Sequence, residues 1–160
     1  MGCGKTTIGR KLASGWGLNL IDLDHYLENK YFKSIPQIFE EEGEESFRRK
    51  EQSALHEVSE FDDVIIATGG GTPCFFDNMD VMNRTGFCIF LDIEEGELVR
   101  RLSRAKTERP VIKGKTKEEL AGFIGEMMKK RRPFYEKAKY ILKGKDITAD
   151  QIMKTIREVS

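Results

Sequence analysis

Hydrophobic positions along this chain follow two different spacings, which predict strands that alternate with helices. Short apolar runs rich in β-branched and aromatic residues are typical of buried strands, whereas apolar residues three or four positions apart are typical of helices with one buried face. Strands are predicted over residues 18–23, 64–67, 87–93 and 140–142. Helices are predicted over residues 4–15, 94–105, 117–130 and 147–159, and in pieces over 26–56, with breaks around 34–36 and at Gly43. The alternation predicts an α/β fold whose parallel sheet is covered by helices on both faces.

The expected sheet also indicates where to look for a ligand. In such sheets the crevice lies at the carboxyl ends of the strands, where the strand order reverses. In this chain those places are just after Leu23, just after Ala67 and at the start of the first helix.

Composition narrows the possible functions. The 160 residues suit one domain, and 27 basic residues balance 27 acidic ones, which argues against a nonspecific electrostatic grip on nucleic acid or on an anionic membrane. Cys3, Cys74 and Cys88 are widely spaced and predict neither a zinc site nor a disulfide framework. The sequence contains no membrane-spanning run and no signal-peptide pattern, so we expect a cytoplasmic protein.

The start of the first helix is the first candidate site. Gly4-Lys5-Thr6-Thr7 matches the second half of the phosphate-binding signature G-x-x-x-x-G-K-[ST]. A helix N-terminus attracts phosphate through its free N–H groups, the lysine adds a cation, and the Thr6 hydroxyl can ligate Mg²⁺. The alternative is a chance occurrence of G-K-T.

A pair of acids follows the first predicted strand. Asp22 and Asp24 are two positions apart, so on a strand they would share one face. Beside a triphosphate, such a pair suits Mg²⁺ handling and the positioning of an acceptor hydroxyl. The alternative is a helix cap or a solvated loop.

Two further motifs suit a small anionic acceptor. Arg48 and Glu51 are neighbours on a predicted helix, where the glutamate can hold a carboxylate-binding guanidinium, unless the two form only a surface ion pair. Gly69, Gly70 and Gly71 follow a buried strand. They let a ligand approach the backbone closely, unless they only form a turn.

Basic segments complete the pattern. Residues 104–120 suit a lid in which Arg109 offsets phosphate charge, or else a solvated basic loop. Arg131 suits a second carboxylate anchor. The alternative is that the basic run 129–132 compensates the helix dipole.

The order and spacing of these motifs resemble shikimate kinase over nearly the whole chain. The matching motifs are G-x-G-K-T-T, I-D-x-D, F-R-x-x-E, G-G-G, R-P and R-x-P-x-Y. The resemblance implies a P-loop kinase with a three-layer α/β/α fold, a parallel sheet ordered 2-3-1-4-5, and direct in-line transfer of the γ-phosphoryl group of ATP to the 3-hydroxyl of shikimate. It also implies a single domain over residues 1–160, with a substrate-binding segment at about 25–60 and a lid at about 106–117.

The resemblance further implies roles for the motif residues. ATP would contact Gly2, Gly4, Lys5, Thr6, Thr7, Arg101 and Arg109, with Arg101 against the adenine. Mg²⁺ would be held by Thr6 and, through water, by Asp22. Shikimate would contact Asp24, Arg48, Gly69, Gly70, Gly71 and Arg131, the pocket walls Phe39 and Phe47, and Glu51 as the support of Arg48. Catalysis would rest on Lys5, Asp24 and Arg109, with Asp24 orienting or deprotonating the attacking hydroxyl and the two arginines 48 and 131 clamping the carboxylate.

The resemblance fails at the front of the chain. The family's first strand and the leading glycine of its phosphate-binding loop have no counterpart before Met1. In the family that strand lies in the middle of the sheet, so we expect two unpaired strand edges and poor folding or function of the chain as it stands. Met1 is either an internal loop methionine or the start of a truncated chain that is inactive or depends on a partner.

The sequence leaves two other functions open. One is another small-metabolite kinase of the same branch, acting on gluconate or a nucleoside monophosphate, and the other is a non-catalytic remnant. The G-G-G and F-R-x-x-E motifs favour shikimate as the acceptor. We expect a monomer that binds neither nucleic acid nor membrane.

Overall fold

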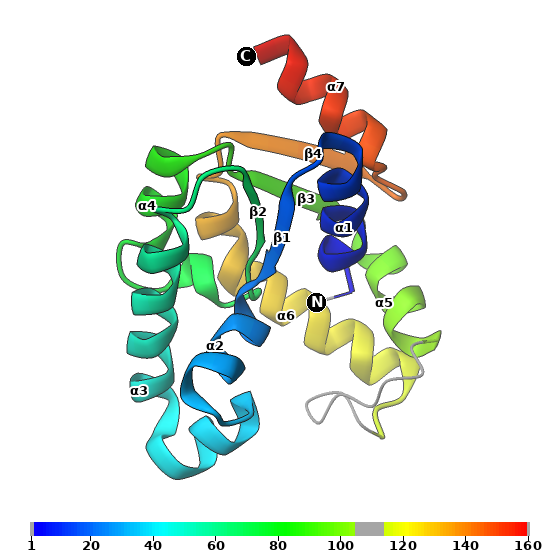
Figure 1. Ribbon diagram of the computed structural model, residues 1–160. Helices are drawn as coiled ribbons and strands as arrows, with labels where there is room; N and C mark the ends of the chain where they lie inside the picture. Colours follow the sequence, from blue (N-terminus) through cyan, green and yellow to red (C-terminus); the bar gives the residue numbers. More distant parts are fainter. Residues whose placement is uncertain (1, 105–113, 160) are drawn as a thin grey trace.

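Helices and strands alternate along the chain, as the hydrophobic spacing predicts (Figure 1). The computed structural model describes residues 2–104 and 114–159. The strands are β1 (Asn19–Asp22), β2 (Val64–Ala67), β3 (Ile89–Ile93) and β4 (Tyr140–Gly144). The helices are α1 (Lys5–Trp16), α2 (Leu23–Tyr31), α3 (Ile35–Val58), the 3-10 turn η1 (Thr72–Cys74), α4 (Asn78–Thr85), α5 (Glu95–Arg104), α6 (Lys117–Tyr135) and α7 (Ala149–Val159). The strands predicted from the sequence are therefore all present, with small differences at their ends.

The strands form two parallel pairs. β1 pairs with β2, from Asn19 opposite Val64 to Asp22 opposite Ala67, and β3 pairs with β4. Among the described strands, β2 and β3 each have a neighbour on one side only. The break falls between β2 and β3, where the family order places its first strand, so the expectation of two unpaired strand edges is confirmed.

Two hydrophobic clusters organise the molecule. The first joins α1, α5, α6 and α7 to β3, with Ile65 of β2 and Leu142 of β4 packed against it, and includes the almost fully buried side chains of Ile93, Ile124 and Ile152. The second joins α2 and α3, through residues such as Leu27 and Leu55, to partly buried side chains of β1 and β2. Both clusters support elements of the candidate site, so each of them fixes one part of it.

The long helical segment is broken where the sequence predicts. Ser34 caps α3, because its hydroxyl accepts a hydrogen bond from the Gln37 N–H at 3.3 Å while the Gln37 side chain accepts one from the Ser34 N–H at 2.8 Å. Gly43 interrupts α3 with φ 82° and ψ 172°, a conformation that favours glycine. The second part of α3, after this interruption, carries Arg48 and Glu51.

Two helices differ from the prediction in the first half of the chain. α1 continues through Gly15 and is closed by Gly17, which adopts the left-handed conformation that ends many helices. The hydrophobic pattern does not predict α4, because its buried apolar residues, Met79 and Val81, are too few to show a helical period.

The end of α6 also differs from the prediction. The helix passes the predicted end at residue 130, continues across Pro133 and reaches Tyr135. Proline removes one backbone hydrogen bond from a helix. The last turn is held instead by side-chain hydrogen bonds of Arg132 to β3 and of Tyr135 to the loop after β2.

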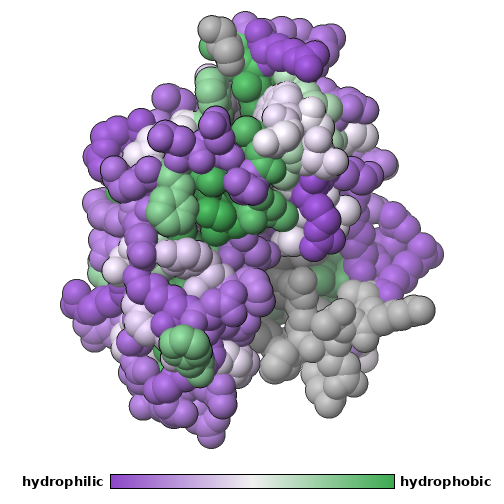
Figure 2. Space-filling view, in the orientation of Figure 1, coloured by the Kyte–Doolittle hydropathy of each residue, from purple (hydrophilic) through white to green (hydrophobic). Residues whose placement is uncertain are grey.

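The face seen in Figure 1 is mostly polar. Figure 2 shows apolar residues gathered over β1, which pairs with a described strand on one edge only. None of the described helices is long and apolar enough to cross a membrane.

Candidate active site

The N-terminus of α1 meets the end of β1 through one hydrogen bond. The Thr6 hydroxyl donates to Asp22 Oδ2 at 3.0 Å. The turn before α1 requires glycine, because Gly2 and Gly4 have φ angles of 72° and 82°. A Cβ atom on Gly2 would also lie 2.9 Å from the Leu102 side chain. The predicted phosphate-binding residues therefore form a left-handed turn that opens a helix, with Thr6 directed at the first predicted acid.

Asp22 and Asp24 interact, but the strand geometry expected for them is wrong. β1 ends at Asp22, and Asp24 lies in the first turn of α2, so the pair does not share a strand face. Asp22 Oδ1 caps α2 by accepting a hydrogen bond from the His25 N–H at 3.4 Å. Burial raises the pKa of Asp24, and the negative charge of Asp22 raises it further, whereas Lys5 lowers it. Asp24 is therefore a partly desolvated carboxyl group between an acid and the α1 lysine.

Arg48 and Glu51 form a buried pair, so the alternative of a surface ion pair is wrong. Arg48 Nη1 donates to Glu51 Oε2 at 2.9 Å, and the glutamate is 1% exposed. Glu51 Oε1 accepts a hydrogen bond from the Thr72 hydroxyl at 2.7 Å. Each carboxylate oxygen thus has a partner, as a buried charge requires.

The glycine loop is closely approached by these same side chains. A Cβ atom on Gly71 would lie 2.6 Å from Arg48 Nη1. A Cβ atom on Gly69 would lie 3.2 Å from Asp24 Oδ1 and 3.3 Å from Glu51 Oε1. The loop therefore lacks side chains at the two places where α2 and α3 bring an acid and an arginine against its backbone. These contacts within the protein are a reason for glycine that the sequence alone does not supply.

The end of α6 reaches the same loop from another direction. The Tyr135 hydroxyl donates to the Gly70 carbonyl at 2.5 Å. Burial raises the pKa of Tyr135, while a hydrogen bond and the positive charge of Arg131 lower it. Burial likewise raises the pKa of the Cys74 thiol, and Arg131 and Arg48 both lower it. The two predicted carboxylate anchors thus approach one thiol, next to the glycine loop.

Arg132, the residue after Arg131, pairs with a carboxylate of β3. Arg132 Nη2 and Nη1 donate to the two carboxylate oxygens of Asp92 at 2.8 and 3.0 Å. This paired hydrogen bonding joins α6 to β3. Arg132 therefore makes a specific contact beyond any compensation of the helix dipole.

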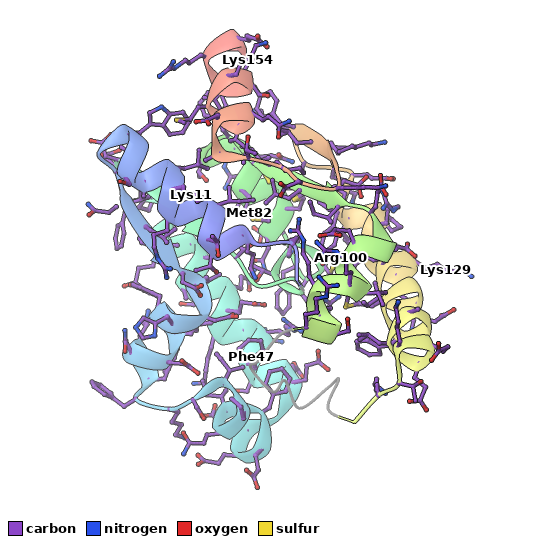
Figure 3. All side chains as sticks on the ribbon, turned by 90° about the vertical axis from the view of Figure 1, so that its right-hand side faces the viewer. Lys11, Phe47, Met82, Arg100, Lys129 and Lys154 are labelled. Carbon is purple, nitrogen blue, oxygen red and sulfur yellow. The ribbon has the colours of Figure 1, made fainter. Side chains whose placement is uncertain are left out.

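The two predicted pocket-wall aromatics pack on each other. The ring centroids of Phe39 and Phe47 lie 4.5 Å apart, and Phe47 is buried. Figure 3 shows Phe47 inside the lower part of the molecule, whereas Lys129 on α6 and Lys154 on α7 project outward. The structure thus brings the aromatic pair together beside Arg48, whose Cζ lies 5.0 Å from the Phe47 ring centroid.

Of the two arginines predicted to contact ATP, Arg101 lies within the described residues and Arg109 does not. Arg101 lies beside the turn before α1: its Nη1 donates to the Cys3 carbonyl at 3.4 Å and its Nη2 to the Lys145 carbonyl at 2.7 Å. It thereby links that turn to the segment after β4. Arg109, with most of the predicted lid, lies outside the described residues.

Three residues of the site carry contacts that the motifs do not reveal. Thr72 and Phe75 follow the glycines, and their partners come from α3. Tyr135 belongs to the R-x-P-x-Y motif, but its hydrogen bond to Gly70 joins positions 65 residues apart. Contacts between such distant positions leave no mark on local spacing.

The donor set at the start of α1 suits a hard cation. Among the described residues, no cluster of three or more His, Cys, Asp or Glu side chains could hold a metal. Thr6 and Asp22 instead supply a hydroxyl and a carboxylate at one point. Mg²⁺ is held in kinases by few protein oxygens together with phosphate and water, so the pair fits it.

A family model described as shikimate kinase matches residues 1–160. The chain belongs to the shikimate kinase family. It is 55% identical to the shikimate kinase of Parabacteroides distasonis over 138 residues, covering 86% of this chain and 80% of the relative. It is 51% identical to that of Phocaeicola vulgatus over 147 residues, covering 92% and 84%.

Solved shikimate kinase structures share the fold. The crystal structure of the Bacteroides thetaiotaomicron enzyme superposes with a TM-score of 0.92 at 43% identity, covering 99% of this chain and 93% of the other. The Acinetobacter baumannii shikimate kinase in complex with shikimate gives 0.84 at 32% identity, covering 99% and 87%. The predicted α/β P-loop kinase fold is thereby confirmed.

Proposed function

We propose that this shikimate kinase phosphorylates the 3-hydroxyl of shikimate with ATP through the site at the glycine loop. The reaction is that of the family to which the chain belongs. The observation that carries the site is the convergence of Asp24, Arg48 and Glu51 on Gly69 and Gly71. This arrangement suits an acceptor with a carboxylate and ring hydroxyls, because it combines a carboxyl group, an arginine and a backbone without side chains.

The nucleotide side of the site is proposed at the start of α1. The phosphates would lie on the turn and first helical residues Gly2, Gly4, Lys5, Thr6 and Thr7. Thr6 and, through water, Asp22 would hold Mg²⁺, which when bound offsets the negative charge of the phosphates. The position of Arg101 beside Cys3 supports a place near the base. Arg109 is proposed to offset charge on the transferring group.

The acceptor side is proposed across α2, α3 and α6. Arg48 and Arg131 would bind the shikimate carboxylate, with Glu51 holding Arg48 and the backbone of Gly69–Gly71 against the ring. Phe39 and Phe47 would form the apolar wall. Arg131 and Arg48 both lower the pKa of the Cys74 thiol, which supports a position of both arginines near that residue.

The proposed chemistry is a direct in-line displacement. Asp24 orients the 3-hydroxyl and accepts its proton as the oxygen attacks the γ-phosphorus, while the bond to the ADP oxygen breaks. The raised pKa of Asp24 makes it a stronger base than an ordinary aspartate. Lys5 and Arg109 stabilise the charge that develops on the phosphoryl oxygens.

One assay tests the function. ADP release from Mg-ATP is measured with shikimate, gluconate and AMP offered in turn, and again after Mg²⁺ is removed with a chelator. We expect turnover with shikimate alone, and none without Mg²⁺. Turnover with gluconate or AMP would indicate another kinase of the branch, and no turnover with any acceptor would favour a non-catalytic protein.

Three further expectations stay predictions. They are a single domain with a substrate-binding segment at about 25–60 and a lid at about 106–117, a monomeric state without nucleic-acid or membrane partners, and a cytoplasmic location. Mass measurement in solution tests the second of these.

A further inference from the structure

The guanidinium of Arg48 is enclosed by contacts from α3 and from the segment at and after the glycine loop. We propose that Thr72 and Phe75, which follow the glycine loop, are positioning residues that hold Arg48 ready for the acceptor carboxylate. This inference rests on the proposed function, in which Arg48 binds that carboxylate.

Thr72 acts on Arg48 through Glu51. The Thr72 hydroxyl donates to Glu51 Oε1 at 2.7 Å, and Glu51 Oε2 accepts from Arg48 Nη1 at 2.9 Å. Thr72 and Glu51 are 0% and 1% exposed, so water cannot replace either partner. Without the hydroxyl, one oxygen of a buried carboxylate would lose its hydrogen bond and Glu51 would be free to turn.

Thr72 is itself fixed in place. Its N–H donates to the Gly69 carbonyl at 3.3 Å, and its carbonyl accepts from the buried Asn78 side chain at 2.9 Å. The hydroxyl that holds Glu51 therefore sits on a backbone tied at both ends, to the glycine loop and to α4.

Phe75 acts on Arg48 directly. Arg48 Cζ lies 4.1 Å from the Phe75 ring centroid and 5.0 Å from that of Phe47. An arginine next to aromatic rings is held by cation–π attraction, which restricts the positions that the guanidinium can take. Thr72 and Phe75 thus constrain the same group, one through hydrogen bonds and the other through contact with its ring.

The contacts leave one edge of Arg48 for a ligand. Arg48 Nε and Nη2 donate to Glu44 at 3.4 and 3.3 Å, and the Glu44 side chain is 60% exposed. An exposed partner can be replaced by a substrate carboxylate, whereas the buried partners stay. Because Arg48 is already held in place, it loses less conformational freedom when the acceptor binds. Thr72 and Phe75 are therefore expected to increase the affinity for the acceptor.

The test compares variants that remove or keep each contact. Thr72→Val keeps the branched shape and removes the hydroxyl, whereas Thr72→Ser keeps the hydroxyl. We expect Thr72→Val to raise KM for shikimate about five- to tenfold, with kcat and KM for ATP within about twofold of wild type. Thr72→Ser should restore a KM close to that of wild type. Calorimetric binding of shikimate should weaken in parallel.

Phe75 gives an independent test with a matched control. Phe75→Leu should raise KM for shikimate by a similar factor, whereas Phe76→Leu should not, because Phe76 is 53% exposed and the guanidinium over its ring is that of Arg49, not Arg48. The inference is overturned if Thr72→Val and Phe75→Leu keep the wild-type KM, or if they lower kcat while KM for shikimate stays unchanged. If wild type itself does not phosphorylate shikimate, the proposed function fails, and that result is seen before any variant is made.

Discussion

The Tyr135 hydroxyl donates a hydrogen bond to the backbone carbonyl of Gly70, at 2.5 Å. This bond joins α6, which carries Arg131, to the glycine loop, whose two ends pack against Asp24 and Arg48. The loop is therefore held from both sides of the proposed acceptor site.

Removal of this hydroxyl should weaken acceptor binding. Tyr135→Phe keeps the ring, which packs on Phe90, and loses one partly buried hydrogen bond of about 1 kcal/mol. We expect KM for shikimate to rise about fivefold with little change in KM for ATP. Tyr140→Phe is the control, because the Tyr140 ring packs on Phe87 away from the loop. Equal kinetics for both variants would contradict this prediction.

A methyl group at Gly71 should displace Arg48. The φ of −85° suits any residue, so the effect of Gly71→Ala would come from the Cβ atom 2.6 Å from Arg48 Nη1 and not from backbone strain. We expect KM for shikimate to rise at least about tenfold, since the proposed carboxylate contact moves. Steady-state kinetics measure this change.

Gly122→Ala is the matched control for that variant. Gly122 lies in α6, and a Cβ atom there would meet nothing within 4 Å. Its kinetics should equal those of wild type, and its stability should rise by up to about 1 kcal/mol because alanine favours a helix. If Gly71→Ala also leaves KM unchanged, the contact between loop and arginine has no part in acceptor binding.

Replacement of Asp24 should stop transfer without loss of ATP binding. Asp24→Asn and Asp24→Ala remove the proposed base, and we expect kcat to fall about 10²–10⁴-fold. ATP affinity, measured by calorimetry, should change little. In wild type, kcat/KM for shikimate should fall as the pH drops through the raised pKa of Asp24. Near-normal turnover by either variant would show that Asp24 is not the base.

The raised pKa of Asp24 should also make the stability of the protein depend on pH. A carboxyl whose pKa is raised in the folded state favours folding fully below its unfolded pKa and loses that contribution as the pH rises through its folded pKa. Asp24→Asn carries no charge at any pH. The variant should therefore gain thermal stability relative to wild type as the pH rises through that interval. A constant difference across the pH range would mean that the pKa is not raised.

The pair of Arg132 and Asp92 should contribute to stability. Asp92 is 10% and Arg132 33% exposed in their side chains, and two hydrogen bonds join them. We expect Arg132→Met to cost about 1–2 kcal/mol, which lowers the thermal midpoint by about 5 °C. Arg49→Met is the control, since Arg49 and Glu45 are 66% and 81% exposed, and should cost less than about 0.5 kcal/mol. Similar losses for both variants would refute a specific anchor at β3.

Local features of the fold could be predicted from the sequence. The start of α3 at Ser34 and its interruption at Gly43 follow from capping and glycine conformation, which act between neighbouring residues. The spacing of Arg48 and Glu51 predicted their pairing for the same reason.

Features that depend on distant contacts could not be predicted. The burial of Glu51 requires Thr72, 21 positions away, and the close approach at Gly71 involves Arg48 from another element. Asp24 reaches its place through the helix that Asp22 caps, not through the strand geometry expected from the sequence. Tertiary packing decides these positions, and no residue spacing records it.

The division into two strand pairs has a consequence for local unfolding. Among the described strands no ladder hydrogen bonds cross from β2 to β3, so side-chain packing joins the two pairs, in which Ile65 of β2 contacts the cluster around α1 and β3. Such halves can open as separate cooperative units, with amide hydrogen exchange that is slow within each pair and differs between them. Asp24 and Arg48 belong to one unit and Arg131 to the other. The proposed acceptor site therefore forms only while the two units stay packed together, so we expect a loss of this packing to abolish acceptor binding before either unit unfolds.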